Sequence, residues 1–184
     1  MKKILAIIIA MIITITFCSC VKTDTNIENY ADDVKKYEAG SFMPDLDEIN
    51  NYKQINYSFR KDETLFVDYS MQLIVKYDEE DFSKEKERLK NAYVYLEEPQ
   101  KAEWDDAFYT IPLEKVSVGG FEIKVVKLED TIYPRNFGMI GVSDEKCEIA
   151  YLWIYAIDLD YICEENEDKN KEMKEFIEYY FSLE

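Results

Sequence analysis

The chain has 184 residues, of which 22 are basic and 39 acidic, and its formal net charge is −17 at pH 7. It has no histidine, which excludes Ser-His-Asp and Cys-His catalysis and histidine-ligated zinc. Such an acidic chain repels nucleic acid and anionic lipid headgroups and attracts cations and basic partners. Plain solubility is the alternative explanation for the acidic excess.

The N-terminus has the three parts of an export signal. Lys2 and Lys3 supply positive charge, and the residues from Ile4 to Phe17 form an apolar stretch. The run Phe17-Cys18-Ser19-Cys20 follows, in which a small residue directly precedes a cysteine. An export signal of this form predicts that the rest of the chain is extracytoplasmic.

This run resembles the lipobox of bacterial lipoprotein signal peptides, although Phe17 and Cys18 depart from the residues common there. The resemblance implies that residues 1–19 are a signal peptide and that Cys20 is lipidated and becomes the mature N-terminus. An uncleaved anchor is the alternative, because residues 4–21 are uncharged and just long enough to span a bilayer. The Lys/Ile/Asn/Tyr-rich composition with an acidic body is similar to that of small uncharacterised lipoproteins of low-GC Gram-positive bacteria.

The first part of the mature chain predicts a tether, a helix and a loop. Residues 20–26 are polar and suit a short lipidated tether. From Ile27 to Glu38 apolar residues recur at helical spacing. Residues 41–52 have no regular period, and we expect a loop with one helical turn after Pro44. Four apolar side chains predict that this loop is pinned to the core: Phe42, Met43, Leu46 and Ile49.

The most regular pattern in the chain runs from Leu65 to Tyr77, where every second residue is apolar. A period of two places these side chains on one face of a strand. The opposite face is mixed, and we expect truncation of Ser70 on that face to change stability little. Together with the alternating residues 55–59 and the polar residues 60–63, the pattern predicts a hairpin.

A helix is predicted from Glu79 to Leu96, with Asp78 as its N-cap. The side chains expected against the core are Phe82, Leu89, Ala92, Tyr93 and Leu96. Those expected in solvent are Lys84, Glu87, Arg88 and Lys90.

The second half of the chain predicts strands and a final helix. A short strand is expected at residues 107–111, and Gly119-Gly120 between alternating runs predicts a tight hairpin. Further strands are expected from Phe137 to Val142 and from Cys147 to Ile157, the latter apolar on both faces. The last helix is predicted from Glu167 to Phe181, with one buried stripe: Met173, Phe176, Ile177, Tyr180 and Phe181.

These elements predict a single α+β domain over residues 27–184. Hairpin links favour a mainly antiparallel sheet of about six or seven strands, with helices packed on it in a two-layer arrangement. Apolar residues make up 47% of the chain and aromatic residues 15%, which is enough for a hydrophobic core.

Two acidic segments are candidate sites. One follows the last predicted strand: Asp158, Asp160, Glu164, Glu165, Glu167 and Asp168. Calcium prefers such oxygen ligands, but the spacing does not match an EF-hand and an acidic helix N-terminus explains most of it. The other is Trp104-Asp105-Asp106, which could stack on a sugar or supply carboxylates, although adjacent Asp side chains diverge and Trp104 suits the cover of a sheet edge.

Cys147 and Cys163 are the thiols of the predicted domain. The strand from Cys147 carries the chain roughly 36 Å away at about 3.3 Å per residue. The five residues that follow return at most about 17 Å, too little for a disulfide. We therefore expect two free, mostly buried cysteines.

The sequence favours a lipid-anchored extracytoplasmic protein that acts as a binding or interaction module, without a cofactor and without a catalytic or metal site that we can name. Its expected partners are the membrane, through Cys20, and an envelope protein or a cationic ligand. A carboxylate-dependent hydrolase and an accessory subunit of an envelope complex are the alternatives.

The first prediction concerns the anchor at Cys20. We expect the mature protein to begin at Cys20, to carry diacylglycerol there and to partition into detergent. Mass spectrometry of the mature N-terminus measures this directly. Retention of residues 1–19, or a Cys20 without lipid, would contradict the lipoprotein assignment.

Overall fold

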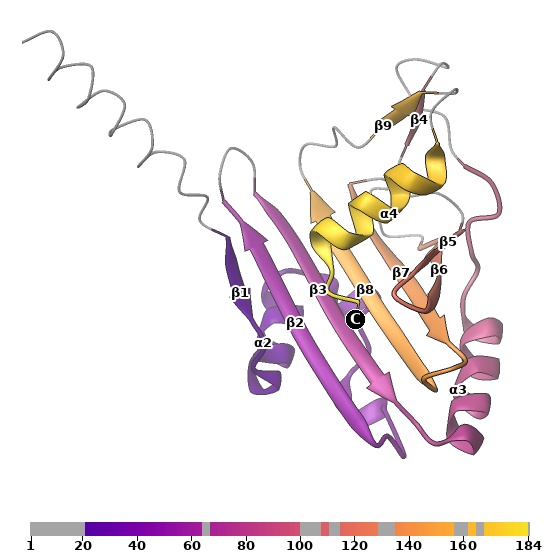
Figure 1. The fold of residues 1–184 in the computed structure, drawn as a ribbon. Helices are drawn as coiled ribbons and strands as arrows, with labels where there is room; N and C mark the ends of the chain where they lie inside the picture. Colours follow the sequence, from indigo (N-terminus) through magenta and orange to yellow (C-terminus); the bar gives the residue numbers. More distant parts are fainter. Residues whose placement is uncertain are drawn as a thin grey trace, which may run out of the picture.

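A seven-stranded antiparallel sheet, with the strand order β1-β2-β3-β8-β7-β6-β5, forms the centre of the fold (Figure 1). The computed structural model describes residues 21–63, 67–99, 108–110, 115–128, 135–156, 162–164 and 168–183, and for 108–110 and 162–164 the backbone alone. The strands are β1 (Lys22–Asp24), β2 (Gln54–Asp62), β3 (Asp68–Lys76), β5 (Lys115–Val118), β6 (Phe121–Val126), β7 (Asn136–Ser143) and β8 (Glu148–Ala156). The predicted α+β fold with a mainly antiparallel sheet is confirmed.

The long alternating stretch of the sequence forms β3, an interior strand between β2 and β8. Its register with β8 is unbroken over the nine residues of each strand. The alternating apolar side chains Met71, Leu73 and Val75 are completely buried on one face. The polar side chains Ser70 and Gln72 on the other face are buried as well, which corrects the expectation that this face is only mixed.

Helix α4 (Lys169–Tyr180) lies across one face of the sheet, in front of it in Figure 1. Its predicted stripe is buried: Met173, Phe176, Ile177, Tyr180 and Phe181. The Ser70 hydroxyl donates to the carbonyl oxygen of Tyr180 at 2.9 Å. The Gln72 amide donates to the Ser182 carbonyl at 2.9 Å and accepts from the Ser182 N–H at 3.0 Å. Two buried polar side chains of β3 thus hold the end of the chain.

The opposite face is covered by α2 (Tyr30–Lys36), α3 (Glu79–Ala92) and the 3-10 turns η1 (Ile27–Asn29), η2 (Ala39–Ser41) and η3 (Leu46–Glu48). Because side chains alternate along each strand, the two faces have separate cores. The core on this face combines Tyr30, Val34, Phe82, Leu89, Met71, Leu73, Val75, Tyr151 and Trp153. Among the described residues, no helix has the length and apolar composition required to cross a membrane.

Helix α3 begins as predicted and ends earlier. The Asp78 carboxylate accepts from the Asp81 N–H at 2.9 Å, which satisfies an N–H group that lacks a helical partner. The helix stops at Ala92, four residues before the predicted end, because Tyr93 is extended. Leu96 then donates its N–H to the carbonyl oxygen of Val125 in β6. The run Tyr93 to Leu96 is rich in aromatic and β-branched residues, which favour extended backbone.

Two short strands, β1 and β9, were not predicted. Residues 22–24 of the expected tether form β1, which pairs with β2 so that Lys22 lies opposite Lys61. The predicted strand at residues 107–111 is β4 (Phe108–Thr110), but it pairs with β9 (Ile162–Glu164) in a separate two-stranded sheet. Strands of three residues are too short to show alternation, so pairing with a neighbour defines them.

The Gly119-Gly120 hairpin between β5 and β6 is confirmed. Both glycines have positive φ, 58° and 83°, a conformation that costs glycine little. A Cβ atom on Gly119 would also collide with the carbonyl oxygen of Leu183, in the segment after α4. The turn therefore packs against the end of the chain.

The second prediction concerns the core around β3 and β8. Leu73→Ala and Ile154→Ala should each lower the free energy of unfolding by about 2–5 kcal/mol, because both side chains are fully buried, on opposite faces of the sheet. Ser70→Ala should cost about 1 kcal/mol, because it leaves the Tyr180 carbonyl without its donor. Urea melts measure all three.

Lys84→Ala on the exposed side of α3 is the matched control and should leave the urea midpoint nearly unchanged. A Leu73→Ala variant as stable as Lys84→Ala would show that β3 does not lie in the core.

Candidate functional site

The segment of residues 40–50, which we call the strap, crosses the face of the sheet beside α3. Phe42, Met43 and Ile49 are buried beneath it, and η3 is the helical turn predicted after Pro44. The Phe42 ring lies directly on the backbone of Gly138 in β7, where a Cβ atom would collide with it. The Tyr30 hydroxyl donates to the Pro44 carbonyl at 2.6 Å. The pinned loop that the sequence predicts is thus confirmed.

A cavity of about 670 Å³ lies between the strap and α3. Strap residues 40–45 and 48–50 line one side, and Glu85, Arg88 and Tyr93 line the other. We call it the strap cavity. Its volume falls in the range of small-molecule sites, and such sites use a few fixed polar groups for specificity.

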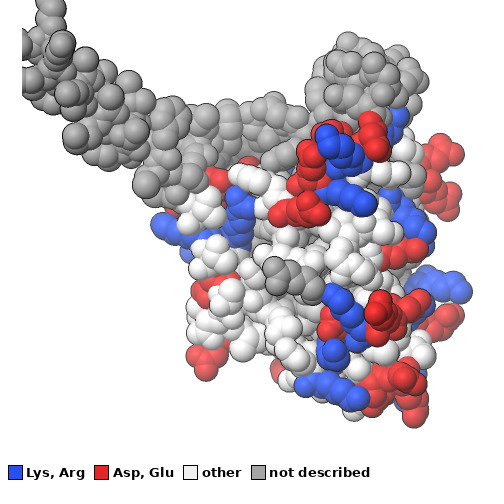
Figure 2. All heavy atoms as spheres, in the orientation of Figure 1, with Lys and Arg blue, Asp and Glu red and all other residues white. Residues whose placement is uncertain are grey.

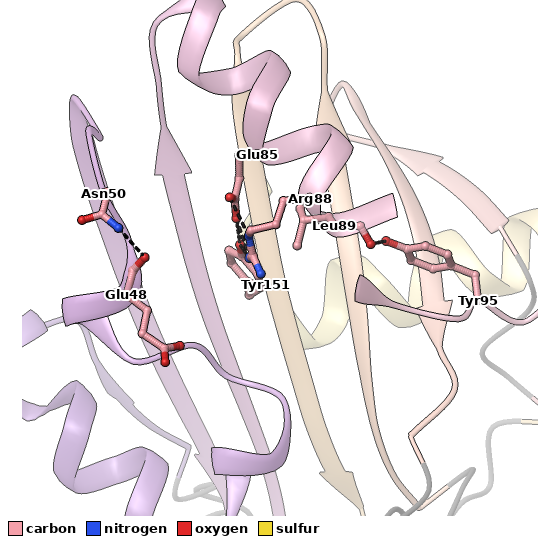
Figure 3. A network of polar contacts seen from close by, with 7 residues as sticks. All are labelled: Glu48, Asn50, Glu85, Arg88, Leu89, Tyr95 and Tyr151. Atoms are coloured by element: carbon pink, nitrogen blue, oxygen red, sulfur yellow. Dashed lines mark hydrogen bonds and ion pairs between the residues drawn. The ribbon is translucent and has the colours of Figure 1, made fainter. Parts of the chain in front are cut away.

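An ion pair on α3 lies at the wall of this cavity (Figure 3). Arg88 binds Glu85 with two parallel hydrogen bonds, Nε to Oε2 at 2.8 Å and Nη2 to Oε1 at 2.7 Å. The two residues are three positions apart, so they share one helix face. The hydroxyl of Tyr151, a fully buried residue of β8, donates to Glu85 Oε1 at 2.7 Å from below.

The environment fixes the charges of these groups. Burial alone would raise the pKa of Glu85, but hydrogen bonds from Arg88 and Tyr151 outweigh it and hold the pKa below its usual range. Burial, followed by the negative charge of Glu85, raises the pKa of Tyr151. At neutral pH Glu85 is therefore ionised and Tyr151 protonated. A general acid at pH 7 needs a raised carboxyl pKa, so the geometry suits binding better than proton transfer.

The strap side of the cavity carries two further carboxylates, Asp45 and Glu48. Both are exposed, and no ion pair joins either of them to another described residue. Asn50 donates to the backbone carbonyl of Glu48 at 3.1 Å, which fixes the turn that carries Glu48. Figure 3 shows Glu48 on the strap, apart from Glu85 and Arg88 on α3, with its side chain directed away from that pair.

A second hollow of about 550 Å³ lies between α3 and strands β6 and β7. Phe82, Leu89 and Ile140 supply apolar contacts. Its lysines and carboxylates pair with each other: Lys86 with Asp144 at 2.5 Å, Lys124 with Glu122 at 3.5 Å and Lys90 with Glu87 at 3.8 Å. Because these charges already have partners, this hollow is a weaker candidate than the strap cavity.

Most acidic residues predicted as candidate sites lie outside the described residues: Asp158, Asp160, Glu165 and Glu167, and also Trp104-Asp105-Asp106 and Cys20. Glu164 belongs to β9, and Asp168 caps α4 by accepting from the N–H groups of Asn170 and Lys171 at 3.2 and 3.3 Å. Within the parts of the chain that the structure describes, no three potential ligand side chains come together to hold a metal ion.

Cys147 forms no disulfide and is half-buried, so it is less buried than predicted. It has a positive φ of 52° and ends the turn before β8 instead of starting that strand. Cys163 lies in β9, and its side chain is outside the described part.

Sequence reasoning did not find the Glu85–Arg88–Tyr151 group. It placed Arg88 in solvent, and the Arg88 side chain is indeed 53% exposed while its guanidinium binds Glu85. The spacing of Glu85 and Arg88 is typical of an exposed helix pair. Tyr151 looks like any other core residue of an apolar strand, so no local signal joins the three.

Comparison of the chain with protein-family models, with curated proteins and with solved structures gives no match. The candidate site therefore rests on its own geometry.

The third prediction concerns the pH dependence of stability. The folded-state pKa of Glu85 is lowered from an unfolded value of about 4.3, so its stabilisation is complete above that pH and is lost as the pH falls through the folded value. Urea melts should show wild type more stable than Glu85→Gln at pH 7, with the difference shrinking below about pH 4. Tyr151→Phe should cost about 1.5–3 kcal/mol at pH 7.

Glu178→Gln, an exposed change on α4, is the matched control and should follow wild type throughout. A constant difference between wild type and Glu85→Gln from pH 7 to pH 3 would mean that Glu85 is not stabilised in its charged form.

Proposed function

We propose that the protein is a lipid-anchored extracytoplasmic binding module and that the strap cavity is its binding site. The observation that carries the proposal is the Glu85–Arg88 pair, held at the cavity wall by the buried Tyr151 hydroxyl. A polar group that is already oriented loses little entropy when a ligand binds to it. The pinned strap closes the other side with a fixed backbone.

The position of β1 supports a close attachment to the membrane. Consecutive Cα atoms are about 3.8 Å apart, so the Cα atoms of Cys20 and Lys22 lie within about 8 Å of each other. Because Lys22 already belongs to the sheet, a lipidated Cys20 keeps the domain directly at the bilayer surface. A ligand-binding domain in this position samples the space next to the membrane.

The hydrolase alternative requires two carboxyl groups that meet in a cleft with pKa values shifted apart. In the strap cavity the half-buried carboxylate of Glu85 is already bonded to Arg88 and Tyr151 and is held ionised. This arrangement favours binding over carboxylate catalysis at the site.

The fourth prediction tests the cavity. Full-length protein in detergent is screened by thermal shift against small polar molecules: amines, amino acids, sugars and carboxylic acids. A compound that binds the folded state stabilises it by about 2.7 kcal/mol at 100 times its Kd. We expect hits with wild type that disappear in Ser41→Trp, because Ser41 is an exposed residue of the cavity lining and an indole there fills the space.

Ser117→Trp on the exposed side of β5 is the matched control and should keep every hit. Hits that survive equally in Ser41→Trp, or a screen without hits for wild type, would overturn the assignment of the strap cavity as the binding site.

A further inference from the structure

The charges around the strap cavity are unevenly paired. Glu85 accepts hydrogen bonds from Nε and Nη2 of Arg88, and the opposite charges of the two residues make the pair neutral as a unit. Asp45 and Glu48 remain on the strap, without an ion pair to any described residue. The cavity therefore presents two unmatched negative charges.

Exposed carboxylates elsewhere include both paired and unpaired ones; Asp32 and Glu178, for example, have no ion pair to another described residue. On the face shown in Figure 2, acidic and basic side chains lie interspersed. Many exposed carboxylates have a basic partner, for example Glu122 with Lys115 at 2.5 Å and Glu175 with Lys171 at 3.5 Å. The unmatched strap carboxylates differ from these because they border a cavity that a ligand can enter.

Tyr93 adds an aromatic wall. It lines the cavity and is half-buried. Burial raises the pKa of its hydroxyl, and the nearby charges of Arg88, Glu85 and Glu48 have smaller effects on that pKa. Carboxylates beside an aromatic ring are the usual surroundings of a bound organic cation. An anion would have only the remaining Nη1 group of Arg88 to bind and would meet the negative charges of Asp45 and Glu48 in the same cavity.

We propose that the strap cavity binds a small organic cation, whose ammonium or guanidinium group is held by the carboxylates of Glu48 and Asp45 beside Tyr93. This inference rests on the proposed function and names the class of ligand for that site. The net charge of −17 attracts cations to the whole protein, and the cavity supplies the local contacts.

Isothermal calorimetry on the full-length protein in detergent tests the proposal, with spermidine and arginine methyl ester as cationic probes and citrate as the anionic counterpart. The cations should bind, and citrate should not. Glu48→Gln should weaken binding about fivefold, as expected for the loss of one partly exposed ion pair worth about 1 kcal/mol. Asp45→Asn/Glu48→Gln should weaken it further, and added salt should weaken binding to wild type.

Ser41→Trp should abolish cation binding, and the exposed Glu178→Gln on α4 should leave it unchanged, which separates the site from general attraction to an acidic surface. Cation binding that is insensitive to Glu48→Gln and Ser41→Trp would overturn the proposal. Citrate binding that Arg88→Lys removes would overturn the cation class and leave the cavity as a binding site. If neither the cations nor citrate bind while Ser41→Trp still removes hits in the thermal-shift screen, the cation class is likewise wrong and the cavity remains a binding site.

Discussion

The pairing of β3 with β8 is the constraint on which the rest of the structure depends. Both strands carry apolar side chains on both faces, with Leu73 on one side and Ile154 on the other fully buried. Neither face can be left in water, because the burial of this apolar surface is the main favourable term in folding. The α4 helix must therefore cover one face, while α2, the strap and α3 cover the other.

The polar side chains within these apolar strands determine where the covering elements are attached. Ser70 and Gln72 point to the α4 face, and the backbone after α4 supplies their hydrogen-bond partners. On the other face Tyr151 brings a hydroxyl beneath α3, and a buried hydroxyl needs a partner. Glu85 accepts that hydrogen bond, and Arg88 balances the charge of Glu85. The Tyr151 hydroxyl thus adds a contact from the core to a helix pair that its i,i+3 spacing already brings together.

The strap links the core to the proposed site. Its apolar side chains, including Phe42 against the bare backbone of Gly138, belong to the hydrophobic core. Its polar side chains, Asp45 and Glu48, are turned outward at the cavity. One short segment therefore stabilises the fold and presents charge to a ligand. Core packing fixes its backbone, so only the side chains of Asp45 and Glu48 have to be ordered when a ligand arrives.

The sequence by itself determined the elements with a strong local period: β3, β8, α3, α4 and the Gly119-Gly120 turn. Each of these depends on side-chain spacing or on backbone freedom within a few residues. The predicted export signal before Cys20, which the structure does not test, is likewise read from a local pattern. The tertiary structure alone decided the strands β1 and β9, the burial of Ser70 and the strap cavity. The cavity lies between the strap and α3, and Tyr151 donates to Glu85, which is 66 positions away in the sequence. Contacts between distant segments therefore form the site.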